Sequence, residues 1–359
     1  MRRGLATVLA VAALAAVLVA AAAAAPAKPR PKPKPKPQPT TIGLFTQNLY
    51  VGFDVQTLLD LSNADTAQFL AATSAAYQAV QASDPAGRMA VVAAEIAARK
   101  PDLVGLNEAA SYQSSAHGFY DFTALIVRGL AKRGLQYKIV ADSKNTDAIV
   151  PIAGGGDFVH FADHDVLLAR VGKGAKTLVI SHARAGHYTD QTVVTTPLGP
   201  VPFPRGWAAA DVRLGTRSFH VVATHLEAFN DARQGTQAHE LIAGPAASKL
   251  PTIVMGDLNS NANSGFNNTE TVPDLLQAGF RDMWATLKPG DPGLTCCEEP
   301  DLKNASPELK QRIDLVLARG AFTPLAGAVV GGDPSARTAS GLWPSDHAGV
   351  WMSLRLPKR

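Results

Sequence analysis

The chain has 359 residues, 46% of them hydrophobic, and only two cysteines, so it can bury a large core but cannot form a framework of several disulfides. Residues 1–40 hold seven of the 34 Lys and Arg residues and no Asp or Glu, which leaves 27 basic against 30 acidic residues and a formal net charge of −3 for the remainder. The basic isoelectric point of the whole chain therefore belongs to its first residues and does not indicate a nucleic-acid-binding surface.

The first residues have the composition of an export signal. Two Arg residues follow Met1, and Leu5–Ala25 is almost entirely apolar. Small residues within 21–27 offer cleavage sites, so we expect a secretory signal peptide over residues 1–27 and a secreted or cell-surface protein. An uncleaved membrane anchor is the alternative, because an apolar run of this length is long enough to span a bilayer.

The next segment is a linker in which Pro alternates with basic residues. The sequence PAKPRPKPKPKPQP favours an extended polyproline II spacer, and we place the linker at residues 28–40. A weak contact between its Lys side chains and a cell wall or another anionic surface is the alternative to a plain spacer. Residues 41–357 remain as one catalytic domain, which we expect to be a monomer.

Beyond the linker, apolar runs rich in β-branched residues alternate with helical stretches, which predicts an α/β layered domain. The helix expected at Pro85–Arg99 has Asp84 as its N-cap. Ala141–Asp165, with a triple glycine, and Asn259–Asn268 are expected to be loops. In chain order, we expect strands at Thr41–Leu49, Leu103–Leu106, Lys138–Val140, Val166–Ala169, Thr177–Ser181, Trp207–Arg213, Ser218–Thr224, Thr252–Met255, Ile313–Ala318 and Gly349–Leu356, and helices at Ala64–Gln81, Pro85–Arg99, Phe119–Arg133 and Ala232–Leu250.

Polar residues that can bind metals or move protons recur where the predicted strands end. Sites in α/β proteins form there because the sheet holds such residues in fixed relation. Each residue alone is more often an ordinary turn or hydrogen-bonding residue, so the interpretation depends on their order. They are Asn48 in TIGLFTQN, Glu108 in PDLVGLNE, His225 in FHVVATH, Asp257 and Asn259 in PTIVMGDLN, Asp314 in RIDLVLA, and Asp346 with His347 in WPSDHAGVW.

This ordered series resembles the endonuclease/exonuclease/phosphatase superfamily, which includes DNase I-like nucleases, exonuclease III-like repair enzymes, sphingomyelinases and inositol-phosphate phosphatases. The resemblance extends from about Thr41 to Leu356, and GDLN and SDH are its most specific parts. It implies a four-layer α/β/β/α sandwich of two packed sheets. It also implies a metal-dependent phosphoric ester hydrolase.

The expected cofactor is Mg²⁺ or Mn²⁺. Phosphodiesters are anionic, and a hard cation that prefers oxygen ligands offsets their charge. Glu108 is the strongest candidate ligand. Asn48 would add an amide oxygen and Asp346 a second carboxylate, and the resemblance assigns the same role to these positions.

The expected catalytic residues surround an activated water. His347, oriented by Asp314, would be the base, because imidazole titrates near neutral pH and a carboxylate can hold its tautomer. Asp257 and Asn259 would orient the water and stabilise the transition state.

Three positions depart from the pattern or leave it open. Resemblance to DNase-like members suggests that His225 donates a hydrogen bond to a phosphoryl oxygen or protonates the leaving group, with Asp163 or Asp165 as its acidic partner. Tyr50 stands where some exonuclease-like relatives carry an Asp. Cys296 and Cys297 are adjacent, so a disulfide between them would be strained, and we expect a loop pair without chemistry.

The sequence leads to three hypotheses about function. The first is a secreted phosphodiesterase that acts on nucleic acid or a phospholipid headgroup. The second is an exported phosphomonoesterase that acts on sugar, inositol or nucleotide phosphates. The third is a tethered, non-catalytic binding protein, and it is disfavoured because every core position of the pattern is filled.

Overall fold

The chain divides into two compact units, Met1–Pro37 and Gln38–Arg359, and the second contains every described residue. The predicted signal peptide, almost all of the linker and Gly154–Gly156 lie outside the described residues. No helix in the described part of the chain has the length and apolarity needed to cross a membrane. The computed structural model describes residues 40–60, 64–116, 118–152 and 157–358.

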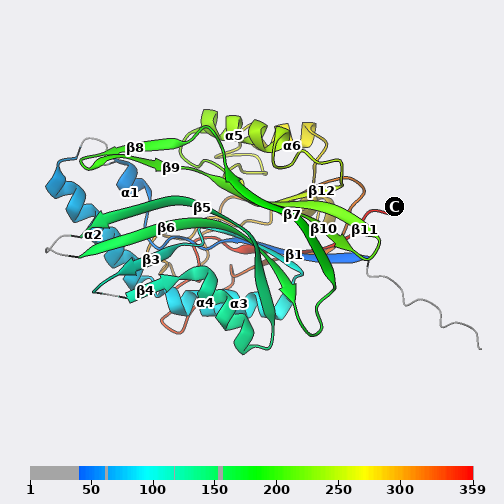
Figure 1. Ribbon diagram of the computed structural model, residues 1–359, viewed down its shortest axis with the longest axis horizontal. Helices are drawn as coiled ribbons and strands as arrows, with labels where there is room; N and C mark the ends of the chain where they lie inside the picture. The colour runs from blue at the N-terminus through cyan, green and yellow to red at the C-terminus, as the bar shows by residue number, and fades with distance from the viewer. Residues whose placement is uncertain (1–39, 61–63, 117, 153–156, 359) are drawn as a thin grey trace, which may run out of the picture. The chain divides into compact units, whose positions relative to one another are not determined.

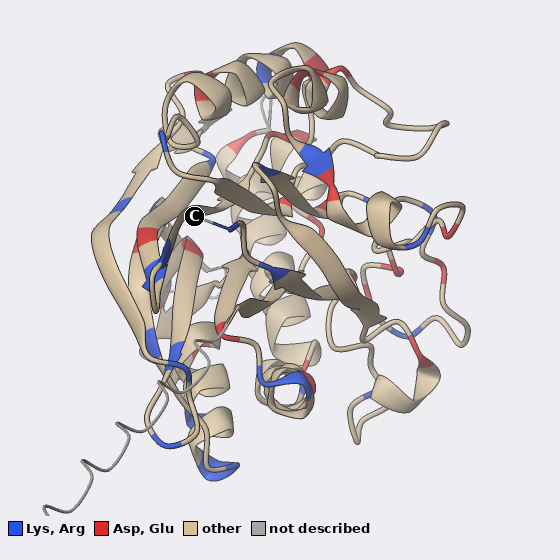
Figure 2. Ribbon diagram, turned by 90° about the vertical axis from the view of Figure 1, so that its right-hand side faces the viewer, with Lys and Arg blue, Asp and Glu red and all other residues tan. Residues whose placement is uncertain are grey.

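Two main sheets form the frame of the second unit (Figure 1; Figure 2 gives the view turned by 90°). The first has the order β15 (Thr323–Val330), β16 (Gly349–Arg355), β1 (Thr41–Asn48), β2 (Leu103–Asn107), β6 (Phe158–Val171), β3 (Ser111–Ser114) and β4 (Gly118–Asp121), with β5 (Gln136–Pro151) paired to β6. The second has the order β13 (Arg281–Asp282), β14 (Asp314–Arg319), β12 (Thr252–Asp257), β11 (Arg217–His225), β10 (Gly206–Leu214) and β7 (Leu178–His187). A separate hairpin pairs β8 (Thr192–Thr196) with β9 (Gly199–Phe203).

Alternating strand residues give the domain its layers. Leu44 packs between the two sheets, whereas its neighbour Phe45 packs against helices on the outer face of the first sheet. Val221 and Val222 divide in the same way, with Val222 under the helices of the second sheet. The helices are α1 (Gln56–Leu59), α2 (Thr66–Ala82), α3 (Pro85–Arg99), α4 (Phe122–Lys132), α5 (Asp231–Ala243), α6 (Thr271–Gln277) and α7 (Met283–Leu287), followed by a short 3₁₀ turn at Pro334–Ala336.

The predicted four-layer α/β/β/α sandwich is therefore confirmed. In Figure 1, α3 and α4 lie outside the first sheet, and α5 and α6 lie outside the second. The helix predicted at Pro85–Arg99 has the predicted bounds, and the side chain of Asp84 accepts a hydrogen bond from the Gly87 backbone N–H at 3.0 Å.

The other three predicted helices have different bounds, and the one expected at Ala64–Gln81 runs from Thr66 to Ala82. The helix expected at Ala232–Leu250 ends at Ala243, because Gly244 and Pro245 interrupt it. The helix expected from Phe119 begins at Phe122, and the three residues before it belong to β4.

The prediction of a loop at Ala141–Asp165 is wrong. This region forms most of β5 and the first half of β6, paired as antiparallel strands. Apart from Ala141, its buried positions in β5 are polar, namely Ser143, Asn145 and Thr146, so the segment lacks the alternating apolar pattern of an ordinary half-buried strand. The hairpin of β8 and β9 was also unexpected, since both strands are short and β9 contains two prolines.

Candidate active site

Strand pairing brings the predicted residues to one end of both sheets. Asn48 ends β1 opposite Asn107, the last residue of the parallel strand β2. His225 ends β11 opposite Asp257, which ends the parallel strand β12. Asp257 in turn faces Asp314, the first residue of the antiparallel strand β14. The side chains that follow these strand ends therefore converge on one region.

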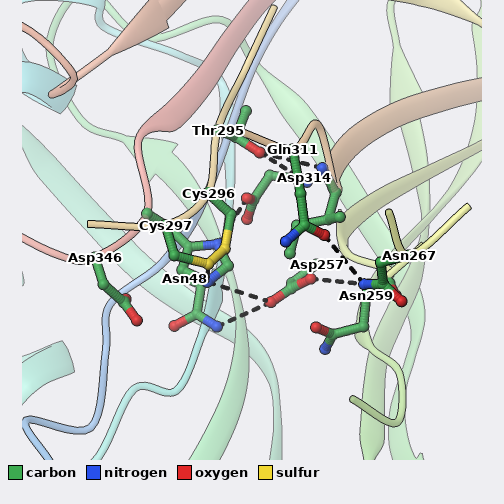
Figure 3. The surroundings of a disulfide bond; sticks show 12 residues. Asn48, Asp257, Asn259, Asn267, Thr295, Cys296, Cys297, Gln311, Asp314 and Asp346 are labelled. Carbon is green, nitrogen blue, oxygen red and sulfur yellow. Dashed lines mark hydrogen bonds and ion pairs between the residues drawn. A yellow bond between two sulfur atoms is a disulfide. The ribbon is translucent and has the colours of Figure 1, made fainter. Parts of the chain in front are cut away.

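Asparagine side chains join the two sheets at this end. The Asn48 Nδ2 donates to Glu108 Oε1 and to Asp257 Oδ2, each at 3.0 Å. The Asp257 backbone N–H donates to Asn107 Oδ1 at 3.0 Å. The amide oxygen of Asn48 accepts from the Tyr50 backbone N–H at 2.9 Å, so its nitrogen, and not the oxygen expected as a ligand, faces the carboxylates. Figure 3 shows Asn48 and Asp257 directed at each other.

The site residues adopt backbone conformations that L-residues rarely take. Tyr50, Glu108 and Asn259 have φ values of 58°, 50° and 48°, in the left-handed region. Each residue in such a conformation costs about 1–3 kcal/mol of folding free energy and persists where surrounding contacts hold it. Here the Val51 N–H donates to Glu108 Oε2 at 2.9 Å, and the Asn259 N–H donates to Asp257 Oδ1 at 2.9 Å. The turns direct both strand ends into the site.

His347 and Asp314 form a buried pair. The distance from His347 Nδ1 to Asp314 Oδ2 is 2.8 Å, and His347 Nε2 lies 3.9 Å from Asp257 Oδ2. Burial alone would lower the pKa of this imidazole. The carboxylates of Asp314, Asp346 and Asp257 outweigh burial and raise the pKa of His347 well above its ordinary value. The Asp314 carboxylate accepts the Nδ1 proton and fixes the ring, which leaves Nε2 on the side of Asp257 at the cavity wall.

His225 has a different electrostatic environment. Its Nδ1 lies 3.2 Å from Arg205 Nη1, and its Nε2 lies 3.0 Å from Asn259 Nδ2 and 3.5 Å from Asp257 Oδ2. Burial, together with the charges of Arg205 and His347, lowers the pKa of His225 well below its ordinary value. Arg205 Nη1 and Asn259 Nδ2 are both donors, so of these three neighbours only Asp257 Oδ2, on the Nε2 side, can accept the proton of the neutral ring. His225 is thus a neutral hydrogen-bond donor and not a cationic acid.

The prediction that Asp163 or Asp165 is the acidic partner of His225 is wrong for both residues. Asn145 Nδ2 donates to Asp163 Oδ2 at 3.1 Å and to Asp165 Oδ2 at 2.8 Å. Among the described residues, neither carboxylate forms an ion pair with His225, and the cation of Arg205 occupies the position beside its Nδ1.

Most of the predicted residues line one cavity. Its volume is about 230 Å³, and of the eight predicted site residues only Asp314 lies behind its wall. Arg205 and Asp163 also line it. Sequence reasoning missed Arg205, since PFPRGW matches no motif and the residue lies in the short connection between β9 and β10. Asn107 was missed although it directly precedes Glu108.

Arg88 of α3 supports the loop after β1. It is fully buried, and its guanidinium donates to the carbonyls of Leu49, Tyr50 and Pro344 at 2.8, 3.1 and 3.2 Å. Burial lowers its pKa to about 10, so it remains charged at neutral pH. Arg88 therefore connects the segment after Asn48 to the segment before Asp346.

The two cysteines are not a plain loop pair, as the sequence suggested. Cys296 and Cys297 form a disulfide (Figure 3). Cys297 lines the cavity, and its Sγ lies 4.0 Å from His347 Nε2. The Cys296 backbone pairs with Gln311 through hydrogen bonds of 2.9 and 3.0 Å, which fix this segment beside β14. The disulfide is thus part of the wall beside the proposed base.

The carboxylates of the cavity fit a hard divalent cation. Burial and the charge of Asp163 raise the pKa of Glu108. Burial raises the pKa of Asp346 to about 6, and Glu108 adds to the effect. Burial and the charge of Asp314 raise the pKa of Asp257 to about 6. Crowded carboxylates with raised pKa values have excess negative charge, and a divalent ion with oxygen ligands relieves it.

Comparison with known proteins agrees with this geometry. A model of the endonuclease/exonuclease/phosphatase family matches residues 46–347. The chain belongs to this family. Members typically hydrolyse phosphate esters and generally use divalent metals. No curated protein matches the chain.

Solved structures support the fold. An endonuclease/exonuclease/phosphatase from Beutenbergia cavernae is 22% identical, with a TM-score of 0.54, over 89% of this chain and 72% of that one. Another from Bacteroides vulgatus is 15% identical, with a TM-score of 0.55, over 89% of this chain and 100% of that one. At these identities the likeness concerns the fold alone.

Proposed function

We propose that this protein is a secreted, divalent-metal-dependent phosphodiesterase. The observation that supports it best is the buried His347–Asp314 pair, which lies at the wall of a cavity that also contains Glu108, Asp346 and Arg205. A base, a carboxylate cluster suited to a cation and a guanidinium in one cavity meet the requirements of attack on an anionic phosphate ester.

In the proposed reaction, His347 Nε2 accepts a proton from water as the water oxygen attacks phosphorus. Asp314 holds the other ring proton and stabilises the imidazolium that forms. The bond from phosphorus to the leaving oxygen breaks, and that oxygen departs with the bonding electron pair. Arg205 and the neutral His225 would donate hydrogen bonds to the phosphoryl oxygens, and Asp257 and Asn259 would orient the attacking water.

Glu108 and Asp346 are the residues that would hold Mg²⁺ or Mn²⁺. Asn48 would join them only after its amide turned, since its nitrogen now faces the carboxylates. When bound, the cation offsets the negative charge of the phosphate and of the carboxylates that make His347 strongly basic.

Export is supported only by the sequence, through the basic start and apolar run of Leu5–Ala25. The Lys/Pro linker would then act as a spacer, with weak contact to an anionic surface as a secondary effect. The N-terminal sequence of the protein recovered from culture medium tests both cleavage and export, and a chain retained uncleaved in the membrane would contradict the proposal.

An assay with paired chromogenic esters tests the catalytic proposal. Purified protein with Mg²⁺ or Mn²⁺ should hydrolyse bis(p-nitrophenyl) phosphate and lose this activity with EDTA. Release of inorganic phosphate from p-nitrophenyl phosphate, with the diester untouched, would instead establish a phosphomonoesterase. No turnover of either ester, or of DNA and RNA, in the presence of metal would refute both.

A further inference from the structure

A second cavity lies directly beside the polar one. It has a volume of about 70 Å³ and lies between α1 and α2, the ends of β5 and β6, and the hairpin of β8 and β9, which lie together on one side of Figure 1. Its walls are mainly apolar, with Phe69 and Val80 from α2 and Val194 and Val201 from the hairpin. A cavity so lined favours an apolar ligand.

Most of the hydroxyl groups in its walls donate hydrogen bonds to backbone carbonyls. Thr73 Oγ1 donates to the Pro151 carbonyl at 3.0 Å, and Thr196 Oγ1 donates to the Gly199 carbonyl at 2.7 Å. The Tyr112 hydroxyl donates to the Val51 carbonyl at 2.8 Å. A nucleobase buried here would leave several of its own polar groups unpaired, whereas a saturated chain has none to satisfy.

The two cavities share a wall. Phe53, Phe161, Phe203 and Thr146 line both of them. The rings of Phe53 and Phe161 meet edge to face, with centroids 6.3 Å apart. Arg205 of the polar cavity follows Phe203 by two residues, so a phosphate beside Arg205 lies next to the aromatic boundary. A substituent of the phosphate would pass these rings and enter the apolar cavity.

The hairpin that covers the apolar cavity is tied to the end of β11. Thr192 Oγ1 donates to Glu227 Oε2 at 2.5 Å, and Arg233 Nη1 donates to Thr192 Oγ1 at 3.0 Å. Glu227 follows His225 by two residues. The cover of the apolar cavity is therefore held in register with the polar site.

We propose that the apolar cavity binds an unbranched alkyl chain of the phosphodiester substrate, so that the substrate is a phosphate ester with a long aliphatic group. This inference rests on the proposed function for the position of the phosphate. It assigns Ala76, Val194 and Val201 to substrate selection and leaves the chemistry to the polar cavity.

A series of p-nitrophenyl alkyl phosphates tests the inference. Methyl, butyl, octyl and dodecyl esters share one reaction, in which water replaces p-nitrophenolate at phosphorus. We expect kcat/KM to rise about fourfold for each added methylene until the cavity is full, because each buried methylene contributes about 0.8 kcal/mol. Equal kcat/KM values along the series, or a preference for a nucleoside ester over the octyl ester, would overturn the inference.

Two variants locate the effect. Ala76→Leu and Val201→Phe fill the cavity from opposite walls, and each should lower kcat/KM for the octyl ester by at least about tenfold while leaving the methyl ester unchanged. Ala75→Leu is the matched control, because Ala75 is the exposed neighbour of Ala76 on α2. Equal losses in all three variants, or none in any, would contradict the assignment.

A binding measurement separates failure of the inference from failure of the proposed function. Titration calorimetry with octyl phosphate and with ethyl phosphate needs no turnover. Tighter binding of octyl phosphate, with a negative heat-capacity change that Ala76→Leu abolishes, supports the cavity even if no ester is hydrolysed. Equal binding of both phosphates refutes the alkyl site even if the methyl ester is a good substrate.

Discussion

The two neighbouring cavities differ in how they are built. The polar cavity draws its side chains from the ends of strands in both sheets, and its charged groups are buried in mutual contact. The apolar cavity lies where α2 and the separate hairpin of β8 and β9 meet the ends of β5 and β6. Catalysis needs atoms held to a fraction of an ångström, which sheet ends provide, whereas selection of an apolar group needs only shape and area. Substitutions in the two cavities should therefore give different kinetic signatures.

Removal of the metal should have the largest effect and act on every ester equally. We expect EDTA to reduce hydrolysis to background, because the clustered carboxylates and the phosphate then repel each other. Glu108→Gln should raise the Mn²⁺ concentration for half-maximal rate by at least about tenfold. Rates measured across a Mn²⁺ titration check both. An unchanged half-saturation point would remove Glu108 from the ligands.

Substitution of His347, the proposed base, should have the second-largest effect on activity. His347→Gln should lower kcat by about 10²–10⁴-fold, in keeping with the loss of general base catalysis, for methyl and octyl esters alike. Asp314→Asn should also lower kcat and should shift the pH profile, since it changes the tautomer and basicity of His347. Octyl phosphate binding should survive in both variants. A loss of activity that was confined to long-chain esters would show that the two cavities do not act independently.

Arg205 should contribute less than the base but still without regard to chain length. We expect Arg205→Gln to lower kcat/KM by about 10²-fold, the range for loss of one donor to the transition state. Arg213→Gln on the exposed face of β10 is the matched control. If Arg205→Gln weakened only octyl ester turnover, Arg205 would belong to substrate selection.

Glu95 lies in neither cavity and should affect stability alone. Both of its carboxylate oxygens are buried without a hydrogen-bond partner among the described residues, and burial raises its pKa from 4.5 to about 8. Between these values the unfolded chain gives up the proton more readily than the folded one, so stability falls as pH rises through this window.

Glu95→Gln should therefore raise Tm by a few degrees at pH 8 and change it little at pH 4. The exposed residue Glu270 offers a control in Glu270→Gln, which should leave Tm unchanged at both pH values. Thermal unfolding monitored by circular dichroism measures this. An increase in Tm that did not depend on pH would rule out the buried carboxylate of Glu95 as its cause.

Sequence reasoning identified the chemistry of the site better than its electrostatics. The pairing of Asp314 with His347 was predicted, and Asp314 Oδ2 lies 2.8 Å from His347 Nδ1. The environment of His225 was not predicted, because Arg205 arrives from a hairpin whose strands carry no strong periodic signal. The disulfide at Cys297 was likewise underrated, since its position beside His347 depends on a backbone pairing with Gln311.

What the sequence by itself determined is local. Alternating apolar residues in β1, the N-cap at Asp84 and the polar residue at each strand end follow from short-range pattern, because a strand has a period of two and a helix start needs a side-chain acceptor. Only the tertiary structure decided which residues meet. Asn48 and Asp257 are 209 positions apart in the chain, yet one hydrogen bond joins them. The apolar cavity likewise exists only where α2, β5, β6 and the hairpin come together, since no single segment encloses a volume.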